Sequence, residues 1–397
     1  MTGERKECEL EDVAEVQTGP FGSQLKNEQY ITGGTPVVTV EHINNFRIVD
    51  FDYPSVTDED KNRLSKYLLQ AGDIIFTRVG SVDLSAYVKK HQDGWMFSSR
   101  MLRVRPKQDV DSRFLSYFFQ QKRFREYILN ISVGATMPSI NTEILKGIPI
   151  SYPPLPEQCA VASVLSSLDD KIDLLHRQNK TLEAMAETLF RQWFVEEADE
   201  GWEEDSLLKL IQLVGGGTPK TSITEYWDGD ISWLAGGDIA ANHKSFVNYA
   251  EKRITEAGLN KSSAKLLPKY ATVISARGTV GKYCLLAEPM AFSQSNYGIL
   301  PKIEDCFFFT YLIINHVVEE LQSSAYGSVF DTITTTTFKE NKVLIPTEKE
   351  IIQFEKSISP YFQKMFINKK QIRTLEKLRD TLLPKLMSGE VRIELES

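Results

Sequence analysis

The sequence predicts an α+β protein in which two globular, mixed α/β domains are separated by two long helices that form an antiparallel coiled coil. Three observations lead to this fold class. The chain of 397 residues contains an internal repeat, each half ends in a long stretch of helical apolar spacing, and the segments between read as strands and glycine-bearing turns.

The repeat has an offset of 193 residues, as from Gly134 to Gly327, and needs no gap across about 55 residues. Identical residues recur at that offset, namely Ile140 and Ile333, Thr142 and Thr335, Lys146 and Lys339, Pro153 and Pro346, Glu157 and Glu350, and Gln178 and Gln371. Such a repeat predicts a pseudo-two-fold molecule, with one frame holding two different domains.

Upstream of these identities the repeat survives only as a pattern. The segment Gly72–Gly80 resembles Ala271–Gly281, and Phe97–Ser99 resembles Phe292–Gln294. Each of the first two segments predicts a buried strand that runs into a glycine-bearing loop, with an arginine, Arg78 or Arg277, at the turn.

Prolines and apolar spacing divide the chain into four parts. Residues 1–152 and 197–345 are the predicted domains, and residues 153–196 and 346–390 are the predicted helices. A helix can begin directly after the Pro153–Pro156 stretch, because proline is tolerated in a first helical turn.

Both predicted helices carry a sustained seam of apolar residues at spacings of three and four, which is typical of a two-helix coiled coil. The alternative is a pair of amphipathic helices in a larger bundle, but nothing else in the sequence offers bundle partners. We expect the pair to be antiparallel, because the returning chain must join the two domains and this direction places one domain at each end. The first seam comprises Val161, Leu165, Leu168, Ile172, Leu175, Leu182, Ala186, Leu189 and Trp193, and the second Phe354, Ile358, Tyr361, Met365, Ile372, Leu375, Leu382 and Leu386.

An asparagine interrupts each seam, Asn179 in the first and Asn368 in the second, and Arg379 occupies a further position of the second seam. Under an approximate two-fold axis these two asparagines face each other, and a buried asparagine pair fixes helix register at some cost in stability. About 40 residues per helix give a rod of roughly 60 Å, long enough to hold two domains one DNA turn of ~34 Å apart.

The net charge is −8, which is unusual for a DNA-binding protein. The acidity is concentrated, however. Residues 157–205 hold 13 acidic and 4 basic residues, a net of −9, so the rest of the chain is near neutral at +1. We expect the acidic helix to stand off DNA or to meet another protein.

Composition excludes several classes of protein. No run of about 18 apolar residues is present, and the first ten residues are too charged for a signal peptide, so we expect a soluble, cytoplasmic protein without membrane contacts. The four cysteines form no C-x-x-C pair and the five histidines form no cluster, so no metal site is expected.

Three short segments come close to catalytic motifs, and each lacks what the chemistry needs. Tyr152–Leu155 has tyrosine where an adenine methyltransferase needs a carboxamide or carboxylate. Gly278–Lys282 lacks both the first glycine and the final Ser or Thr of a phosphate-binding loop. Glu59–Lys61 lies in a charged, turn-like stretch without a preceding strand carboxylate. We therefore expect no catalytic residues in this chain.

Several loops instead have a composition suited to DNA. Arginine reads guanine, and asparagine or glutamine reads adenine, while Ser, Thr and Lys position phosphates. The candidate DNA-binding residues are Ser23, Gln24, Lys26, Arg78, Ser81, Ser99, Arg100, Lys220, Thr221, Arg277, Thr279, Lys282, Gln294 and Asn296. Arg103 and Arg105 alternate in a way that also fits the outer face of an exposed strand.

These segments resemble the specificity subunits of Type I restriction-modification systems, across nearly the whole chain. Gly216–Lys220 with Glu225–Trp233, and Gly19–Leu25 in the first half, resemble the openings of target-recognition domains. Pro153–Gln158, Leu189–Val195 and Leu382–Arg392 are similar to the conserved regions of the family. Pro346–Glu350 departs from the Pro-Leu-Pro-Glu-Gln form, so the second helix entry is less typical.

The resemblance implies two target-recognition domains, each reading one half of a bipartite site in double-stranded DNA. It also implies that the helices dock two modification (methyltransferase) subunits, and that two restriction (translocase/nuclease) subunits can join. S-adenosylmethionine, ATP and Mg would be bound by those partners, and this chain would bind no cofactor. Two alternatives stay open, a coiled-coil scaffold whose domains do not bind DNA and a self-contained restriction or methylation enzyme.

Overall fold

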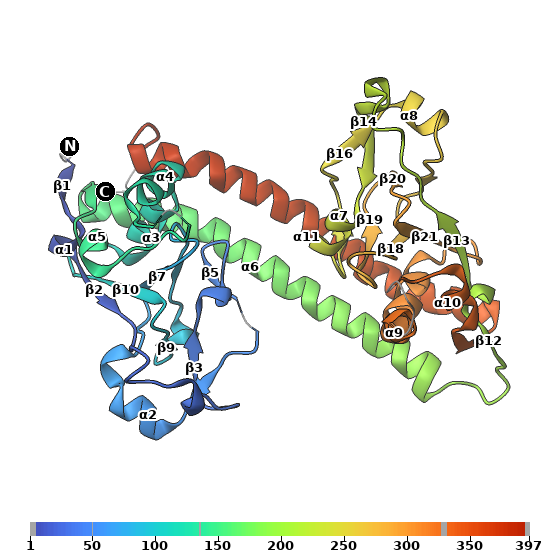
Figure 1. Ribbon diagram of the computed structural model, residues 1–397, viewed down its shortest axis with the longest axis horizontal. Helices are drawn as coiled ribbons and strands as arrows, with labels where there is room; N and C mark the ends of the chain where they lie inside the picture. The colour runs from blue at the N-terminus through green and yellow to red at the C-terminus, as the bar shows by residue number, and fades with distance from the viewer. Residues whose placement is uncertain (1–4, 50, 135, 327–331, 394–397) are drawn as a thin grey trace. The chain divides into compact units, whose positions relative to one another are not determined.

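The computed structural model describes residues 5–49, 51–134, 136–326 and 332–393. Gly327, the partner of Gly134 in the repeat, lies outside these ranges. The chain divides into two compact units, the first made of Met1–Ile172 and Thr374–Ser397, and the second of Asp173–Arg373. Each unit contains one globular domain together with part of each long helix (Figure 1).

The domain of the first unit is built on a four-stranded antiparallel sheet of order β2-β10-β7-β8. Its strands are β2 (Ala14–Thr18), β10 (Met101–Pro106), β7 (Ile74–Thr77) and β8 (Ser85–Tyr87). Smaller sheets and ladders complete the domain, formed by β6 (Ser55–Val56), β3 (Thr35–Val38) and β9 (Met96–Phe97), by β4 (Ile43–Asn44) and β5 (Arg47–Ile48), and by β1 (Lys6–Glu9) and β11 (Pro149–Tyr152).

Short helices close this domain, and α2, α3 and α5 each begin at a polar side-chain cap. Asp111 and Asn141 accept hydrogen bonds from backbone amides at the starts of α3 and α5, as helix N-caps do. The helices are α1 (Leu10–Val13), α2 (Asp58–Arg63), α3 (Ser112–Gln120), α4 (Lys122–Ile131) and α5 (Thr142–Lys146). Phe76 on β7 packs edge-on against Phe119 on α3, which places the core between sheet and helices.

The domain of the second unit repeats this plan with additions. Its main sheet has the order β13-β21-β18-β19-β15 and its second sheet the order β16-β14-β20-β17. The strands are β12 (Glu204–Ser206), β13 (Ile211–Gly215), β14 (Trp227–Leu234), β15 (Phe246–Val247), β16 (Lys252–Ile254), β17 (Leu266–Leu267), β18 (Thr272–Ser275), β19 (Tyr283–Leu286), β20 (Met290–Phe292), β21 (Asn296–Pro301) and β22 (Lys342–Leu344). The helices are α7 (Gly236–Ala241), α8 (Glu256–Asn260), α9 (Phe307–Tyr326) and α10 (Thr335–Glu340).

The strand pairings show that the repeat extends beyond the part detected by identity. The order β2-β10-β7-β8 of the first unit corresponds to β13-β21-β18-β19 of the second, and in both units a parallel strand pair lies in the smaller sheet. A terminal two-stranded ladder also recurs, β1 with β11 and β12 with β22. The two domains therefore have the same strand order although their amino-acid sequences differ.

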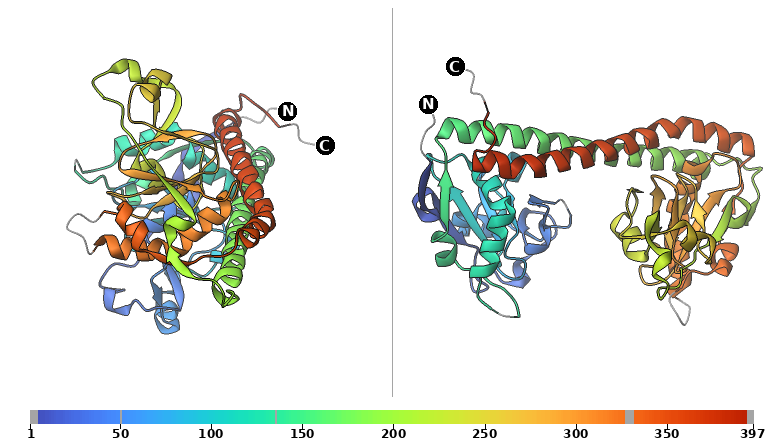
Figure 2. Two further views of the ribbon diagram at one scale, coloured as in Figure 1. Left: turned by 90° about the vertical axis from the view of Figure 1, so that its right-hand side faces the viewer. Right: turned by 90° about the horizontal axis from the view of Figure 1, so that it is seen from above.

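The two long helices are α6 (Leu155–Arg191), which ends in a π-helical turn Gln192–Glu196, and α11 (Glu348–Ser388). Within each unit their segments lie side by side along one face of the globular domain, as the right-hand view of Figure 2 shows. Every seam position predicted from the sequence is buried or half-buried, and the two helices meet at the seam positions Trp193 and Phe354.

The expectation that the helices have no other partners is wrong. In the second unit α9 packs against α11, where the rings of Phe308 and Phe362 stack at 4.5 Å. In the first unit Phe114 of α3 shares a core with Val161 and Leu165 of α6. In the second unit the sequence prediction missed this because α9 is apolar on most of its faces and does not stand out as a one-faced helix. Each long helix thus has a second apolar face that binds its own domain.

The predicted asparagine pair is present. Asn368 Nδ2 donates to Asn179 Oδ1 at 2.9 Å, and Asn368 is fully buried. In the same unit the rings of Trp193 and Phe354 lie 5.5 Å apart, which is the same antiparallel register. Two side chains that the seam pattern placed opposite each other therefore meet.

Candidate nucleic-acid interface

The candidate interface of the first domain is a tight loop after β7. Thr77 N donates to Leu84 O at 3.1 Å and closes the loop, and Gly80 sits within it at a φ of +85°, a conformation that favours glycine. Arg78 N donates to Arg100 O at 2.8 Å, and Arg78 O accepts from Ile140 N at 2.9 Å. The loop is thus joined on one side to the segment before β10 and on the other to the start of α5.

The Arg78 side chain borders an open cleft of about 510 Å³. Its Nη1 donates to Thr18 Oγ1 and to Ser99 O, both at 3.4 Å, and its guanidinium lies 5.9 Å from the ring centre of Phe21. Ser99 and the exposed Arg100 also line the cleft. The guanidinium is half-buried and held in place, so it offers oriented donors to an acceptor that enters the cleft.

The other candidate DNA-binding residues of this domain are of two kinds, exposed residues and one residue that holds a turn in place. Ser23, Lys26 and Ser81 are exposed and can reach a ligand. Gln24 is half-buried, and its Oε1 accepts from Tyr67 Oη at 2.7 Å and from Phe21 N at 3.3 Å. Gln24 therefore holds the turn that presents Phe21.

The second domain has an equivalent loop after β18. Ser275 N donates to Lys282 O at 2.7 Å and closes it, and Gly278 has a φ of +77°. Ala276 N donates to Ser295 O at 3.0 Å, while Ala276 O accepts from Ile333 N at 3.1 Å. These contacts match those of Arg78 one for one, down to Ile140 and Ile333, which are related by the sequence repeat.

The matched contacts correct the alignment of the two arginines. Arg78 is equivalent to Ala276, and Arg277 is equivalent to Val79, so the sequence comparison was wrong by one position. The two arginines were aligned with each other because both loops hold an arginine directly after a short buried strand. The two loops therefore share backbone contacts and carry their arginines at adjacent positions, half-buried for Arg78 and exposed for Arg277.

The candidates of the second domain include four exposed residues, Lys220, Thr221, Arg277 and Gln294. Lys282 is half-buried. Thr279 Oγ1 donates to Ser275 Oγ at 3.0 Å and to Gly236 O at 3.3 Å, which ties the loop to the start of α7.

Asn296 conflicts with the expectation of a direct base contact. It is 1% exposed, and its Nδ2 donates to Ser293 Oγ at 2.8 Å. Its position in β21 turns the side chain under the loop, which the sequence pattern did not reveal. Asn296 thus supports the interface from inside the domain.

Arg103 and Arg105 are also placed differently from the sequence interpretation. Arg103 is only 4% exposed and donates to Leu68 O at 3.2 Å, while Arg105 forms an ion pair with Asp73 at 2.7 Å. Burial lowers the pKa of Arg103, whereas the Asp73 carboxylate raises that of Arg105. Both residues brace β10 against a neighbouring segment, so this strand does not expose an arginine-lined face.

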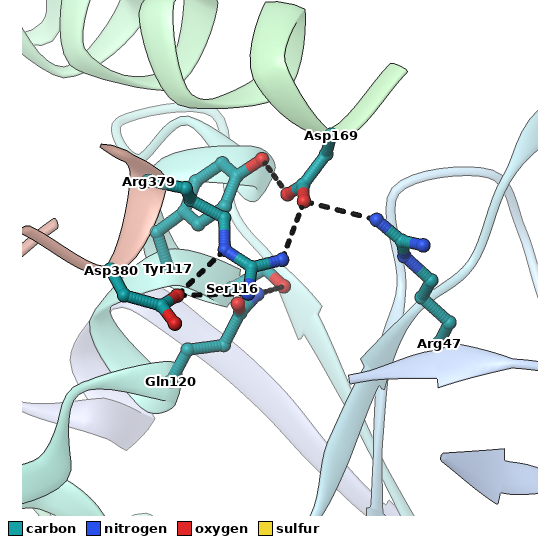
Figure 3. Close-up of polar contacts among 7 residues, drawn as sticks. All are labelled: Arg47, Ser116, Tyr117, Gln120, Asp169, Arg379 and Asp380. Atoms are coloured by element: carbon teal, nitrogen blue, oxygen red, sulfur yellow. Dashed lines mark hydrogen bonds and ion pairs between the residues drawn. The ribbon is translucent and has the colours of Figure 1, made fainter. Parts of the chain in front are cut away.

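Sequence reasoning missed the charged cluster around Asp169, which joins the first domain to both helices (Figure 3). Asp169 on α6 accepts from Tyr117 Oη at 2.6 Å, from Arg379 on α11 at 2.9 Å and from Arg47 at 3.1 Å. Burial and the adjacent carboxylate raise the pKa of Tyr117, so its hydroxyl remains a donor. Arg379 fills a seam position, and an arginine in an apolar seam is the one signal that pointed here.

The second unit uses different polar contacts in the corresponding region. Glu355 on α11 accepts from Phe309 N at 2.7 Å and from Phe308 N at 3.2 Å, and so caps the start of α9. Glu183 on α6 lies near Glu187 and Tyr311. Burial, with smaller effects of neighbouring groups, raises the pKa of each of Glu183 and Glu355 to about 7.

The near-catalytic segments have structural settings of their own. Glu59–Lys61 lies in helix α2 rather than in a turn, where Asp60 pairs with Arg63. The Gly278–Lys282 segment leads into strand β19, whereas a phosphate-binding loop leads into a helix. Within the described residues, no three His, Cys, Asp or Glu side chains group closely enough to hold a metal ion. In the same part of the chain, none of the helices has the length and apolar character of a membrane span.

Comparison with known proteins gives one consistent result. The family model described as the Type I restriction modification DNA specificity domain matches residues 3–184 and 199–377. The MjaIX specificity subunit of a Type I restriction enzyme from Methanocaldococcus jannaschii is 25% identical over 97% of this chain and 93% of its own length. The HindI specificity subunit from Haemophilus influenzae is 22% identical over 82% of this chain and 88% of its own length.

A solved structure supports the same fold. The crystal structure of a Type I restriction-modification S subunit from M. genitalium aligns with a TM-score of 0.64, at 15% identity, over 99% of this chain and 97% of that chain. Since the family model covers both halves of the repeat, the chain belongs to the Type I restriction-modification DNA specificity family.

Proposed function

We propose that this chain is the DNA-reading subunit of a Type I restriction-modification complex, and that it has no catalytic activity of its own. Each domain reads one half of a bipartite site in double-stranded DNA. The observation that carries the proposal is the pair of equivalent loops after β7 and β18, which share backbone contacts and differ in side chains. Two loops with the same backbone and different side chains can recognise two different half-sites in DNA.

The side chains at these loops support DNA as the ligand. Arg78 and Arg277 can each offer paired donors to guanine, and Gln294 can offer the amide that pairs with adenine. The exposed Ser23, Lys26, Ser81, Lys220 and Thr221 suit phosphates. Family membership supports the same assignment.

In this proposal the long helices set the spacing between the two half-sites and dock two modification subunits, with two restriction subunits able to join. The partners would bind S-adenosylmethionine, ATP and Mg, and would carry out methylation, translocation and cleavage. Within the chain, residues 1–152 and 197–345 serve as the target-recognition domains, and residues 153–196 and 346–390 as the conserved helical regions.

Co-expression with the modification subunit, followed by mapping of methylated adenines in host DNA, tests the proposal. We expect methylation at a motif of two short blocks joined by an unspecified spacer. The purified complex should bind that motif with an affinity that falls steeply as salt rises. A scaffold without DNA-binding domains would give neither result, and methylation by the chain without its partner would reveal an enzyme.

A further inference from the structure

The middle of α11 carries an excess of positive charge, in contrast to the acidic region 157–205. Between Ile351 and Arg373 the one acidic residue, Glu355, is buried under α9. The other charged residues of this stretch are all positive: Lys356, Lys364, Lys370 and Arg373 are exposed, and Lys369 is half-buried. The corresponding residues of the repeat, 158–180, hold three acidic and three basic residues, so the positive stretch is not a property of the frame.

Three lysines gather where this stretch meets the second domain. Lys369 Nζ donates to Ser245 Oγ at 3.0 Å. The Nζ atoms of Lys269 and Lys370 lie 4.6 and 4.4 Å from the centre of the Phe366 ring, so the two ammonium groups are within about 9 Å of each other. The aromatic ring holds both charges in place while leaving Lys370 exposed.

This cluster continues toward the candidate interface of the same domain. Lys244 N donates to Tyr283 O at 2.9 Å, and Tyr283 directly follows Lys282 of the loop after β18. Ser245, the partner of Lys369, follows Lys244 in sequence. Two carboxylates of α6 lie beside Lys244: Glu187 approaches it at 4.0 Å, and Glu183 interacts with it electrostatically. We call Lys282, Lys244, Lys369, Lys269, Lys370 and Arg373 together the lysine track.

We propose that the lysine track binds the phosphate backbone of duplex DNA beside the half-site read by the second domain. The inference rests on the proposed function and extends it from base reading at the loop to backbone binding along α11. Duplex DNA is favoured because the track begins at the reading loop, and because ammonium groups on flexible stems bind phosphates without regard to sequence. Lys369, Lys370 and Arg373 share one flank of α11 by helical spacing, as contacts along a continuous backbone require.

The test replaces two exposed track residues in the full chain, Lys370→Gln with Arg373→Gln. The matched control, Lys356→Gln with Lys364→Gln, makes the same charge change on the same helix outside the track. Binding to a random-sequence duplex and to a duplex carrying the mapped site is measured from 50 to 200 mM salt. Thermal unfolding midpoints equal to that of the unsubstituted chain establish that both variants fold.

The proposal predicts that the track variant binds both duplexes more weakly by the same factor, roughly three- to tenfold for each lost cation. The slope of log affinity against log salt should fall by about 1 for each cation, and the control should keep both values. Three results would overturn the proposal: no difference from the control, a loss confined to the site duplex, or unchanged DNA binding with lost assembly of modification subunits. If the unsubstituted chain binds neither duplex, the proposed function itself fails.

Discussion

At the scale of single residues, the sequence identified the right segments better than it identified the roles within them. Arg78 and Arg277 both lie in the predicted loops after buried strands, yet backbone contacts place them at adjacent rather than equivalent positions. Asn296 and Arg103 have the composition of DNA-reading residues and are buried. Local composition does not show whether a polar side chain faces solvent or is buried against a strand. Burial depends on segments far away in the sequence, such as the one whose Leu68 carbonyl accepts a hydrogen bond from Arg103.

The two loop arginines should affect different halves of the site. Arg78→Ala and Arg277→Ala should each weaken recognition of one half-site by about 1–3 kcal/mol and leave the other unchanged, since each arginine belongs to one domain. Methylation profiles on libraries randomised in either half measure this directly, with Lys122→Ala as a surface control. Equal loss at both halves, or no loss at all, would contradict the assignment.

Glu183 should make stability depend on pH. Burial first, and then Glu187, raise its folded pKa to about 7, above the ordinary value of 4.5, while Lys244 and Tyr311 act in the opposite direction. The folded state therefore keeps a proton that the unfolded state loses, so stability should fall as pH rises from about 4.5 to about 7.

Glu183→Gln removes this titration and should raise the thermal midpoint above pH 7, with little effect near pH 4.5. The effect is on the order of 1–3 kcal/mol after allowance for partial exposure. Unfolding curves across this pH range provide the measurement, and Glu376→Gln, at the equivalent position of the repeat, is the control. An unchanged pH profile would show that Glu183 titrates normally.

At the scale of elements, the long helices were the most predictable part of the fold. Their seams were read from spacing alone, because a two-helix contact imposes a period on the sequence. The second apolar face toward the globular domains was not predicted, since its residues, such as Phe362 against α9 and Phe366 against Phe246, interleave with the seam. The Asp169 cluster was also missed, because Arg47, Tyr117 and Arg379 are far apart in the chain.

The asparagine pair should matter more for register than for stability. Asn179→Ala removes the nearer acceptor of the buried Asn368 amide, leaves only Gln178 Oε1 at 3.4 Å, and should cost about 1–3 kcal/mol. Replacing both with leucine should be neutral or stabilising, because no unpaired polar group then remains. Denaturant unfolding of the two variants, with Lys180→Ala as a surface control, tests this. A double variant less stable than the single one would refute the explanation.

The Asp169 cluster should secure the first domain to the helices. Asp169→Asn leaves Arg379 and Arg47 without their shared carboxylate and should lower stability by about 1–2 kcal/mol, a modest value because the group is partly exposed. Asp170→Asn, a neighbour with a longer ion pair at 3.7 Å, should change stability little. Faster amide hydrogen exchange in α3 and in the nearby turns of the long helices should report the lower stability of Asp169→Asn. Equal effects of the two variants would contradict a special role for Asp169.

At the scale of the whole molecule, duplication gave the sequence its clearest signal. An ungapped repeat predicted two domains on one frame, and the strand orders β2-β10-β7-β8 and β13-β21-β18-β19 confirm it. The strands β15 and β17 of the second domain were not predicted, because each is only two residues long and gives no detectable period. A duplicated fold with different loops allows the two halves of the protein to bind different ligand surfaces.

Mapping of methylated adenines produced by the complex that contains this chain tests the central claim most directly. The account predicts two short, unlike sequence blocks separated by an unspecified spacer of constant length, with substitutions in one domain altering one block. A single continuous block, or substitutions in either domain that alter both blocks together, would contradict it.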